Sequence, residues 1–591
     1  MWTYLPPLRD MRFVMDELLE VRRDWSQIPR FADLDADLVP QILDEAGKFA
    51  AAVLEPLNGP GDLEGCRLEA GAVRTPAGFG DAYRRFREAG WPSLACDPES
   101  GGQGLPQLLN VALYEMLNST NHAWTMYSGI SHGAYETLRA HASEFLKTTY
   151  LPKIVSGEAL SSMCLTEPQA GSDLGLLRTR AEPLGDGSHA ITGTKIFISG
   201  GDHDLTDNIL HLVLARLPDA PVGTRGISLF LVPKRASDGG APNGVRCDGI
   251  EKKMGIKGSA TCVMSFDGSK GWLIGEPNRG LAAMFVMMNS ARVMVGLQGL
   301  AHAEMAYQNA LRYAAERIQS RAVTRPPTAG ERHPSGAEPI VYQPAVRRTL
   351  LTLRAFVEGE RALVLWCAHL LDLADSHPEP ARRAEAHDLV SLLTPVVKAF
   401  CTDNGFALSS AALQLWGGYG YVHDYGIEQT VRDSRIAMIY EGTNEIQAVD
   451  LLVRKVIGDG GVKFGAIVEH VSAEADACEN TQGCQAFGSA LRAEHRALSR
   501  ITAELVAESA TAPEYAIRAA ADFLRLVGLV VLGTLWARAA RIAAAHGADP
   551  FYEAKRETAH FYFDHLLPEA QARREAVQRR DKALPWVDAP G

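Results

Sequence analysis

The chain has 591 residues, which at about 150 residues per domain predicts several domains rather than one. Its composition, 46% hydrophobic and 22% charged, is typical of a globular protein and argues against disorder, collagen-like repeats and coiled-coil rods. The 59 Lys and Arg residues against 71 Asp and Glu give a net charge of -12. This balance argues against a nucleic-acid binder held by bulk positive charge.

The cysteines and the apolar segments predict the compartment. Nine cysteines, an odd number, include no C-x-x-C pair, so we expect free thiols in a reducing compartment and no zinc site. The N-terminal segment has prolines and mixed charges where a signal peptide needs an apolar core. The most apolar run, residues 526–537, is shorter than the roughly 20 residues of a membrane helix. We therefore expect a soluble, cytoplasmic protein without a membrane span.

Hydrophobic periodicity divides the chain into helical and β-rich parts. Apolar residues at spacings of three and four predict helices on both sides of a central region in which the period shifts toward two. Turn-rich breaks between the central segments predict an antiparallel barrel or sandwich. The predicted parts are an N-terminal extension (1–37), an N-terminal helical domain (38–159), a middle β domain (160–280), a helical bundle domain (281–460) and an additional C-terminal helical domain (461–591).

Several common catalytic motifs are absent from the sequence. No G-x-G-x-x-G follows a predicted strand and opens a helix, and there is no Walker loop and no G-x-S-x-G. No H-E-x-x-H motif or His/Cys cluster has ligand spacing, so we expect no metal. These absences argue against nicotinamide-dependent Rossmann enzymes, kinases, α/β-hydrolases and zinc hydrolases.

In two segments of the β-rich part, ligand binding rather than packing could account for the residue types. CLTEPQAGSD (164–173) has small polar residues and a glycine that let backbone amides approach a ring or a phosphate, although a surface turn has a similar composition. In ITGTKIFISGG (191–201), strand alternation places Phe197 and Ser199 on one face. The ring could stack on a planar cofactor while the hydroxyl binds its edge. An ordinary core phenylalanine beside a solvated serine is the alternative.

A third segment runs from RDSR (432–435) to IYEGTNEIQ (439–447). Asn444, with Gln447 three residues later, resembles a capping box and predicts the start of a helix. Glu441 then lies just before a helix N-terminus, beside a glycine that lets a ligand approach the backbone. A single loop glutamate is usually a solvated carboxylate, so the spacing alone gives it no role.

In this order, the three motifs resemble those of the acyl-CoA dehydrogenase family over residues 40–455. The N-terminal phrase YLPPLRDMRF and the C-terminal addition resemble a longer bacterial branch that includes 3-methylmercaptopropionyl-CoA dehydrogenases and broad fatty acyl-CoA dehydrogenases. The resemblance implies a mainly α fold with a central β domain. Its parts are an N-terminal helical domain, a middle antiparallel β domain, a C-terminal four-helix bundle and an extra C-terminal helical domain.

The resemblance also implies an FAD site, an acyl-CoA site and a catalytic base, Glu441. The implied flavin contacts within the subunit are Leu165, Thr166, Phe197 and Ser199, with Thr443 and Glu445 at the adenosine. Those to the FAD of a neighbouring subunit are Arg317, Gln414, Gly417 and Gly418. The implied substrate contacts are Gly171 and Ser172 near coenzyme A, and Arg292, Tyr440 and Gly442 near the base.

The implied reaction is the α,β-desaturation of an acyl-CoA to the trans-2-enoyl-CoA, a step of fatty-acid β-oxidation. Glu441 would remove the α-proton and flavin N5 would take the β-hydride, and a homodimer would pass the electrons to an electron-transfer flavoprotein. A medium- or long-chain fatty acyl-CoA is the preferred substrate, and 3-methylmercaptopropionyl-CoA is the alternative. An acyl-CoA oxidase stays open, and a non-catalytic nucleic-acid-binding flavoprotein is a remote alternative that the balanced charge of the C-terminal region disfavours.

The sequence departs from the family pattern at four positions. Phe197 stands where many members have tryptophan, and Ser320 where the shorter members have a phenylalanine that packs on the flavin. Met163 replaces a common aromatic residue, and Glu445 stands where some members have glutamine. These differences leave the chemistry in place and change the expected surroundings of the ring.

Overall fold

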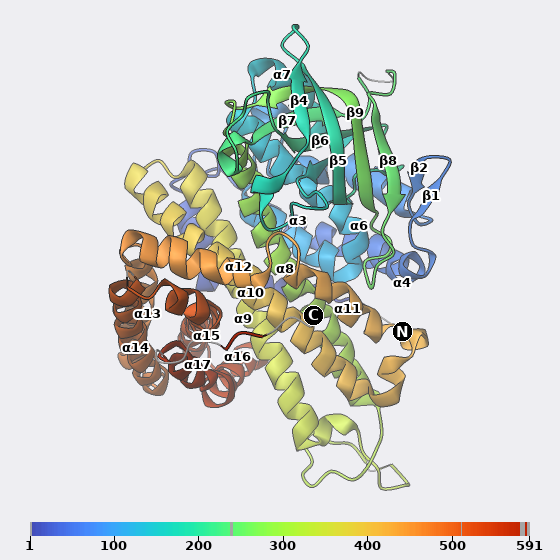
Figure 1. The fold of residues 1–591 in the computed structure, drawn as a ribbon. Helices are drawn as coiled ribbons and strands as arrows, with labels where there is room; N and C mark the ends of the chain where they lie inside the picture. The colour runs from blue at the N-terminus through green and yellow to red at the C-terminus, as the bar shows by residue number, and fades with distance from the viewer. Residues whose placement is uncertain (1–2, 237–239, 332, 510, 580–584, 588–591) are drawn as a thin grey trace. The chain divides into compact units, whose positions relative to one another are not determined.

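The computed structural model describes residues 3–236, 240–331, 333–509, 511–579 and 585–587 (Figure 1). Its contacts separate two compact units, each built from segments that are distant in the sequence. Unit 1 comprises Met1–Leu8, Leu34–Met305 and Gly420–Ile436. Unit 2 comprises Arg9–Asp33, Ala306–Tyr419 and Ala437–Gly591.

Unit 1 contains a seven-stranded sheet in the order β3-β6-β7-β9-β5-β4, with β8 paired to β9 (Figure 1). The predicted β region is confirmed, and the pairing is antiparallel except that β3 runs parallel to β6. The strands are β3 (Ala159–Cys164), β4 (Arg180–Pro183), β5 (His189–Ser199), β6 (Asn208–Ala215), β7 (Ser228–Pro233), β8 (Val245–Ile250) and β9 (Thr261–Ile274).

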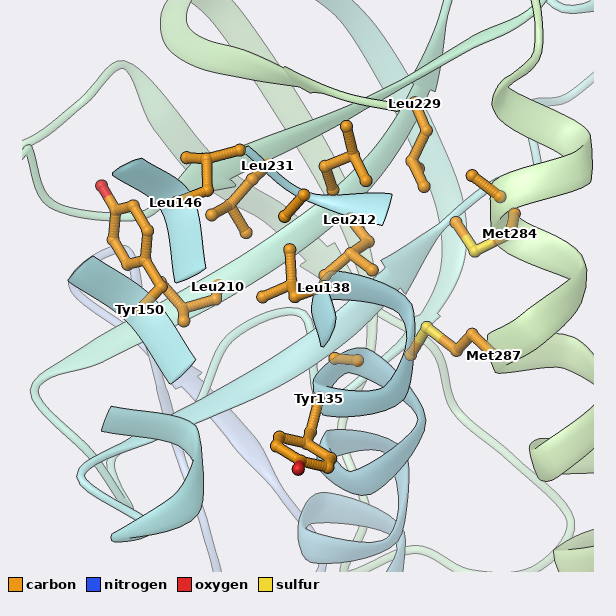
Figure 2. Packing of buried hydrophobic residues seen from close by; sticks show 14 of the residues in the cluster. Tyr135, Leu138, Leu146, Tyr150, Leu210, Leu212, Leu229, Leu231, Met284 and Met287 are labelled. Atoms are coloured by element: carbon orange, nitrogen blue, oxygen red, sulfur yellow. The ribbon is translucent and has the colours of Figure 1, made fainter. Parts of the chain in front are cut away.

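The central strands bury both of their faces. Along β6, Leu210 and Leu212 belong to one core cluster, and Val213, between two members of that cluster, belongs to another. Period-two alternation sends neighbouring side chains to opposite faces, so burial of both faces requires a nearly continuous apolar run. Figure 2 shows the first cluster, in which the strand leucines pack against Tyr135, Leu138, Leu146, Tyr150, Met284 and Met287.

Helices of unit 1 cover this face of the sheet. The helical side chains labelled in Figure 2 come from α6 (Gln107–His141), α7 (Glu144–Val155) and the first turns of α8 (Gly280–Glu316). The remaining elements of the N-terminal region are α3 (Leu38–Phe49), α4 (Glu55–Glu64), β1 (Arg67–Glu69), β2 (Ala72–Arg74) and α5 (Phe79–Glu88).

Helix α6 is interrupted at Asn121, whose backbone is extended (φ -156°, ψ 83°). The Asn121 side-chain oxygen accepts a hydrogen bond from the amide of Trp124 at 3.0 Å, and its Nδ2 donates to the carbonyl of Leu54 at 3.4 Å. The side chain thus caps the second half of the helix as an N-cap residue does, which stabilises the break.

Unit 2 is helical. Its helices include α9 (Pro344–Ser376), α10 (Pro380–Trp416), α12 (Asn444–Val449), α13 (Phe464–Glu479), α14 (Gln485–Ser509), α15 (Pro513–Ala544), α16 (Pro550–Phe561) and α17 (Glu569–Val577). Among the described residues, α8 and α15 are long and apolar enough to cross a membrane. The apolar window of α15 is 83% buried and that of α8 is 50% buried, as expected of core helices. The apolar run at 526–537 is therefore the centre of a longer core helix, α15.

The N-terminal extension packs on the C-terminal helices within unit 2. Arg9 forms an ion pair with Asp549 at 2.9 Å, and Phe13 contacts the ring of Phe551 edge-on at 5.5 Å between centroids. Tyr552 donates to the carboxylate of Glu17 at 2.8 Å. The N-terminal phrase and the C-terminal addition are therefore parts of one packed structure.

A buried carboxyl group on α9 makes the stability of unit 2 depend on pH. Glu360 is 0% exposed, its Oε1 accepts from Asn404 at 2.7 Å, and its Oε2 has no hydrogen-bond partner among the described residues. Burial raises the pKa of Glu360 to about 8, although Asn404 and Arg525 act in the opposite direction. The folded chain therefore keeps a proton that the unfolded chain loses above about pH 4.5, so stability falls as the pH rises toward 8.

We expect Glu360→Gln to remove this penalty, because glutamine is uncharged at every pH. The variant should unfold at a higher temperature than the parent at pH 8 and at a similar temperature near pH 5. The gain at pH 8 should amount to a few kcal/mol, since each pKa unit corresponds to about 1.4 kcal/mol. Scanning calorimetry at both pH values tests this, and an equal pH-dependent loss in parent and variant would contradict it.

Candidate functional site

The motif at 164–173 is held by a single buried carboxylate. Glu167 is 4% exposed and accepts from the amides of Arg178 and Thr179 at 2.7 and 3.0 Å. It also accepts from the Thr179 hydroxyl at 2.6 Å and from Gln169 Nε2 at 2.7 Å. Burial would raise the pKa of Glu167, but Lys195 and these hydrogen bonds lower it to about 2. The carboxylate is therefore ionised and fixes the loop.

Lys195 joins this loop to strand β5. Its side chain is 0% exposed, and Nζ donates to Glu167 Oε1 at 2.8 Å and to the carbonyl of Leu165 at 3.0 Å. The amide of Ile196 donates to the carbonyl of Thr166 at 2.9 Å. These contacts bring Leu165 and Thr166 beside the strand that carries the predicted flavin contacts Phe197 and Ser199.

Phe197 lies at an irregularity in the pairing of β5 with β9. The register shifts between Lys195 and Ile198, and the backbone of Phe197 is left-handed, with φ 59°. The side chain is 60% exposed, so the alternative of an ordinary core phenylalanine is wrong. Strand alternation does not hold across this bulge, so the argument that placed Phe197 on the face of Ser199 does not apply. An exposed ring on a strained backbone is typical of a ligand contact.

The predicted substrate contacts in unit 1 lie in two environments. Gly171 and Ser172 are exposed, and a Cβ at Gly171 would have no described atom within 4 Å. Packing therefore does not require glycine there. Arg292, on α8, is 7% exposed and donates to Asn289 Oδ1 at 3.4 Å.

In unit 2, the end of α8 and the end of α10 lie side by side. Tyr313 and Trp416 stack at 4.2 Å between ring centroids, and the Arg317 guanidinium lies over the ring of Tyr419 at 5.3 Å. The predicted residues Gln414, Gly417 and Gly418 are exposed beside this contact. Gly417 ends α10 with a φ of 61°, which favours glycine. The arrangement presents a cation and open backbone, as a diphosphate site requires.

Glu441 lies on a short loop whose backbone is held from α12. Its φ is 56°, and Gly442 follows with φ 86°. Gln447 is 0% exposed and its Nε2 donates to the carbonyl of Glu441 at 3.1 Å. Tyr440, Glu441 and Gly442 are half-buried. The left-handed conformation and the buried hydrogen bond fix the backbone from which the carboxylate projects.

The predicted helix start is confirmed, but the predicted cap is wrong. Helix α12 begins at Asn444, and Thr443 is its N-cap, with its hydroxyl accepting from the amide of Ile446 at 3.5 Å. Asn444 is instead bound to α10, where Lys398 donates to its Oδ1 at 2.8 Å and its Nδ2 donates to Asp403 at 2.6 Å. Of the two predicted adenosine contacts, Thr443 is half-buried and Glu445 is exposed.

The RDSR part of the third motif has a packing role that the sequence did not indicate. Arg432 pairs with Asp62 at 2.7 Å and donates to the carbonyl of Met254 at 3.2 Å. Asp433 accepts from the amide of Ile256 at 2.5 Å. Within unit 1, these two residues therefore anchor the loop at 254–256. These packing contacts account for Arg432 and Asp433 without a ligand.

Sequence reasoning also missed the linking roles of Glu167, Lys195 and Lys398, although the first two lie inside the motifs. Among the residues that the structure describes, no group of three His, Cys, Asp or Glu side chains could hold a metal ion.

Family models match successive parts of the chain. The acyl-CoA dehydrogenase N-terminal domain matches residues 39–158, its middle domain 162–269 and its C-terminal domain 327–456. A model described as acetyl-CoA dehydrogenase C-terminal like matches 465–585.

Similar proteins extend over nearly the whole chain. The 3-methylmercaptopropionyl-CoA dehydrogenase of Ruegeria pomeroyi is 41% identical over 97% of this chain and 98% of the relative. The broad-specificity linear acyl-CoA dehydrogenase FadE5 of Mycobacterium tuberculosis is 34% identical over 99% of both. A solved acyl-CoA dehydrogenase complexed with FAD, from Bacillus anthracis, shares the fold at a TM-score of 0.69 and 20% identity, over 96% of this chain and 91% of that one. The chain therefore belongs to the acyl-CoA dehydrogenase family of FAD-containing oxidoreductases that act on CH–CH bonds.

Proposed function

We propose that this protein desaturates an acyl-CoA thioester to the trans-2-enoyl-CoA, with Glu441 as the base. One observation carries the proposal: Glu441 stands on a left-handed backbone locked by Gln447, directly before the capped start of α12. A carboxylate that removes a proton from carbon needs such fixed geometry, because proton transfer depends on a positioned group.

The residues present fit an FAD cofactor. The exposed ring of Phe197, the half-buried Ser199 and the linked segment with Leu165 and Thr166 offer a stacking face and hydrogen-bonding groups to the flavin. Thr443 and Glu445 would hold the adenosine. Arg317, Gln414, Gly417 and Gly418 would hold the diphosphate of the FAD bound by a second copy of the chain. When bound, the flavin supplies the acceptor, N5, for the β-hydride.

Residues of the chain itself carry out the proton transfer. The Glu441 carboxylate takes the α-proton, and the amide of Glu441 donates to the thioester carbonyl on which negative charge develops. Gln447 holds the Glu441 carbonyl, which keeps this backbone from rearranging during the reaction. Tyr440, Gly442 and Arg292 would line the acyl end of the substrate, and Gly171 and Ser172 would contact coenzyme A.

For the substrate, the comparisons support a short thioether acyl-CoA, 3-methylmercaptopropionyl-CoA, because the relative with that name is 41% identical. The broad-specificity linear relative, 34% identical, supports linear acyl-CoAs as the second candidate. Medium- or long-chain acyl-CoAs, which the sequence analysis preferred, are therefore the second candidate.

The proposed partners are an electron-transfer flavoprotein and a second copy of this chain. The exposed group around Arg317 supports the dimer, because it has the composition of a diphosphate site. Nine free thiols support a cytoplasmic location. An acyl-CoA oxidase would form hydrogen peroxide with oxygen as the acceptor, so a peroxide assay in air separates that alternative.

Anaerobic titration of the FAD-loaded protein with 3-methylmercaptopropionyl-CoA, butyryl-CoA, octanoyl-CoA and palmitoyl-CoA tests the proposal. We expect stoichiometric bleaching of the oxidised flavin band, most effectively by the thioether substrate. A preference for octanoyl-CoA or palmitoyl-CoA would keep the reaction and change the substrate. A flavin that no acyl-CoA reduces would overturn the proposed reaction.

Replacement of Phe197 separates cofactor binding from folding. We expect Phe197→Gly to weaken FAD binding about tenfold or more, since stacking on an aromatic ring contributes about 1–3 kcal/mol. The cofactor-free protein should unfold near the parent temperature, because the ring is exposed and glycine relieves the left-handed strain. FAD titration by fluorescence measures the affinity. Phe145→Ala, which removes another exposed ring in unit 1, should leave FAD binding unchanged.

A further inference from the structure

The buried ion pair of Lys195 and Glu167 has no assigned role in the reaction. The two side chains are 0% and 4% exposed. A buried pair often contributes little net stability, because desolvation of both charges offsets their attraction. Glu167 closes the loop through its hydrogen bonds, but other polar side chains could do so without a buried cation. The position of the ammonium group therefore needs a separate explanation.

The ammonium of Lys195 binds one peptide of the loop at 164–173 directly. Nζ donates to the carbonyl oxygen of Leu165 at 3.0 Å, and that carbonyl belongs to the same peptide unit as the amide N–H of Thr166. A carbonyl that accepts a hydrogen bond from a cation polarises its peptide and makes the N–H a stronger donor. The neighbouring peptide is held as well, because the Thr166 carbonyl accepts from Ile196 on β5.

We propose that Lys195 is a positioning residue that raises the reduction potential of the flavin through the Leu165–Thr166 peptide. The inference rests on the proposed function, in which Leu165 and Thr166 lie at the flavin edge. Reduction brings two electrons to the ring as the substrate hydride. A strengthened donor stabilises the more electron-rich, reduced ring relative to the oxidised one. Because the Glu167 carboxylate balances the charge of Lys195, the effect acts through the polarised peptide.

A purely structural role of Lys195 makes a different prediction. If the ion pair only shaped the loop, its loss would change stability and FAD affinity together and leave the potential of the bound flavin unchanged. The potential therefore separates the two roles.

The test uses Lys195→Met and the double variant Lys195→Met/Glu167→Gln, each saturated with FAD. The single variant leaves the Glu167 carboxylate buried without its cation, so it should unfold at a lower temperature than the parent. The double variant removes that unpaired charge and should recover most of the thermal stability. In both, the equilibrium constant for two-electron flavin reduction should fall about tenfold, equivalent to about 30 mV, measured against a reference dye under anaerobic conditions.

Lys555→Met is the matched control. Lys555 is 3% exposed, pairs with the carboxylate of Asp10 and lies on α16, outside the proposed flavin site. This variant should lose thermal stability while the flavin keeps the parent potential. A drop in potential in Lys555→Met would show that any lost buried lysine alters the flavin.

The inference is overturned if the equilibrium constants of both Lys195 variants stay within twofold of the parent, or if the double variant recovers the potential together with the stability. Failure of both variants to hold FAD would also overturn it, because Lys195 would then act on the loop structure alone. A parent protein that binds no FAD overturns the proposed function itself. A parent that acyl-CoA reduces, with variants at the parent potential, overturns only the role of Lys195.

Discussion

Glu441→Gln is expected to slow the reduction of the flavin by acyl-CoA by about a thousandfold or more, while FAD stays bound. The amide has nearly the shape of the carboxylate but cannot accept the α-proton, and general-base catalysis contributes about 10²–10⁴ in rate. The loop should keep its conformation, because Gln447 binds the backbone carbonyl of residue 441 rather than its side chain. Anaerobic stopped-flow measurement of flavin absorbance gives the rate.

The control for this variant is Glu469→Gln, which neutralises an exposed carboxylate on α13. It should reduce the flavin at the parent rate. A Glu441→Gln enzyme that retains more than a tenth of the parent rate, with FAD bound, would show that another group removes the proton.

Asp10→Ala is expected to destabilise unit 2 by about 3–5 kcal/mol, because it leaves two buried cations without their shared partner. Asp10 is 9% exposed and pairs with Arg361 and Lys555, whose side chains are 1% and 3% exposed. In calorimetry the transition that contains unit 2 should move down by about 5 °C or more. Asp81→Ala, which breaks an exposed ion pair with Arg84, should cost no more than about 1 kcal/mol.

The same carboxylate gives a pH dependence with a defined sign. Burial would raise the pKa of Asp10, but Lys555 and Arg361 lower it below its ordinary value. Its contribution is therefore complete above the unfolded-state pKa of about 3.9 and is lost as the pH falls further. The difference between parent and Asp10→Ala should shrink below about pH 4, and a constant difference down to pH 2 would contradict this assignment.

The elements that depend on local pattern could be predicted from the sequence. The β-rich region that the period-two pattern predicts contains β5 and β9, and α10 ends at Trp416, directly before two glycines. Fold class followed from the same periodicity together with the family motifs. These features depend on neighbours within a few residues, so the sequence contains the information directly.

Features that depend on distant partners could not be predicted. The bulge at Phe197 arises from the register of β5 against β9, and the parallel pairing of β3 with β6 joins strands far apart in the chain. Thr443 replaced Asn444 as the helix cap because Asn444 is bound to α10. The motifs predict which segments carry the site, and the packing of the whole chain decides which of their side chains hold the backbone and which stay accessible.

The joining of the N-terminal extension to the C-terminal helices has a consequence for synthesis of the chain. Arg9 leaves the ribosome 540 residues ahead of its partner Asp549. All of Leu34–Met305 is made in the interval and can fold before unit 2 has its full set of residues. Phe13 is 3% exposed in the folded protein and contacts Phe551. Until Phe551 has been synthesised, the apolar segment around Phe13 lacks this contact. A ribosome that stops before residue 549 therefore releases a chain with an uncovered N-terminal segment, which is a target for chaperones and proteases.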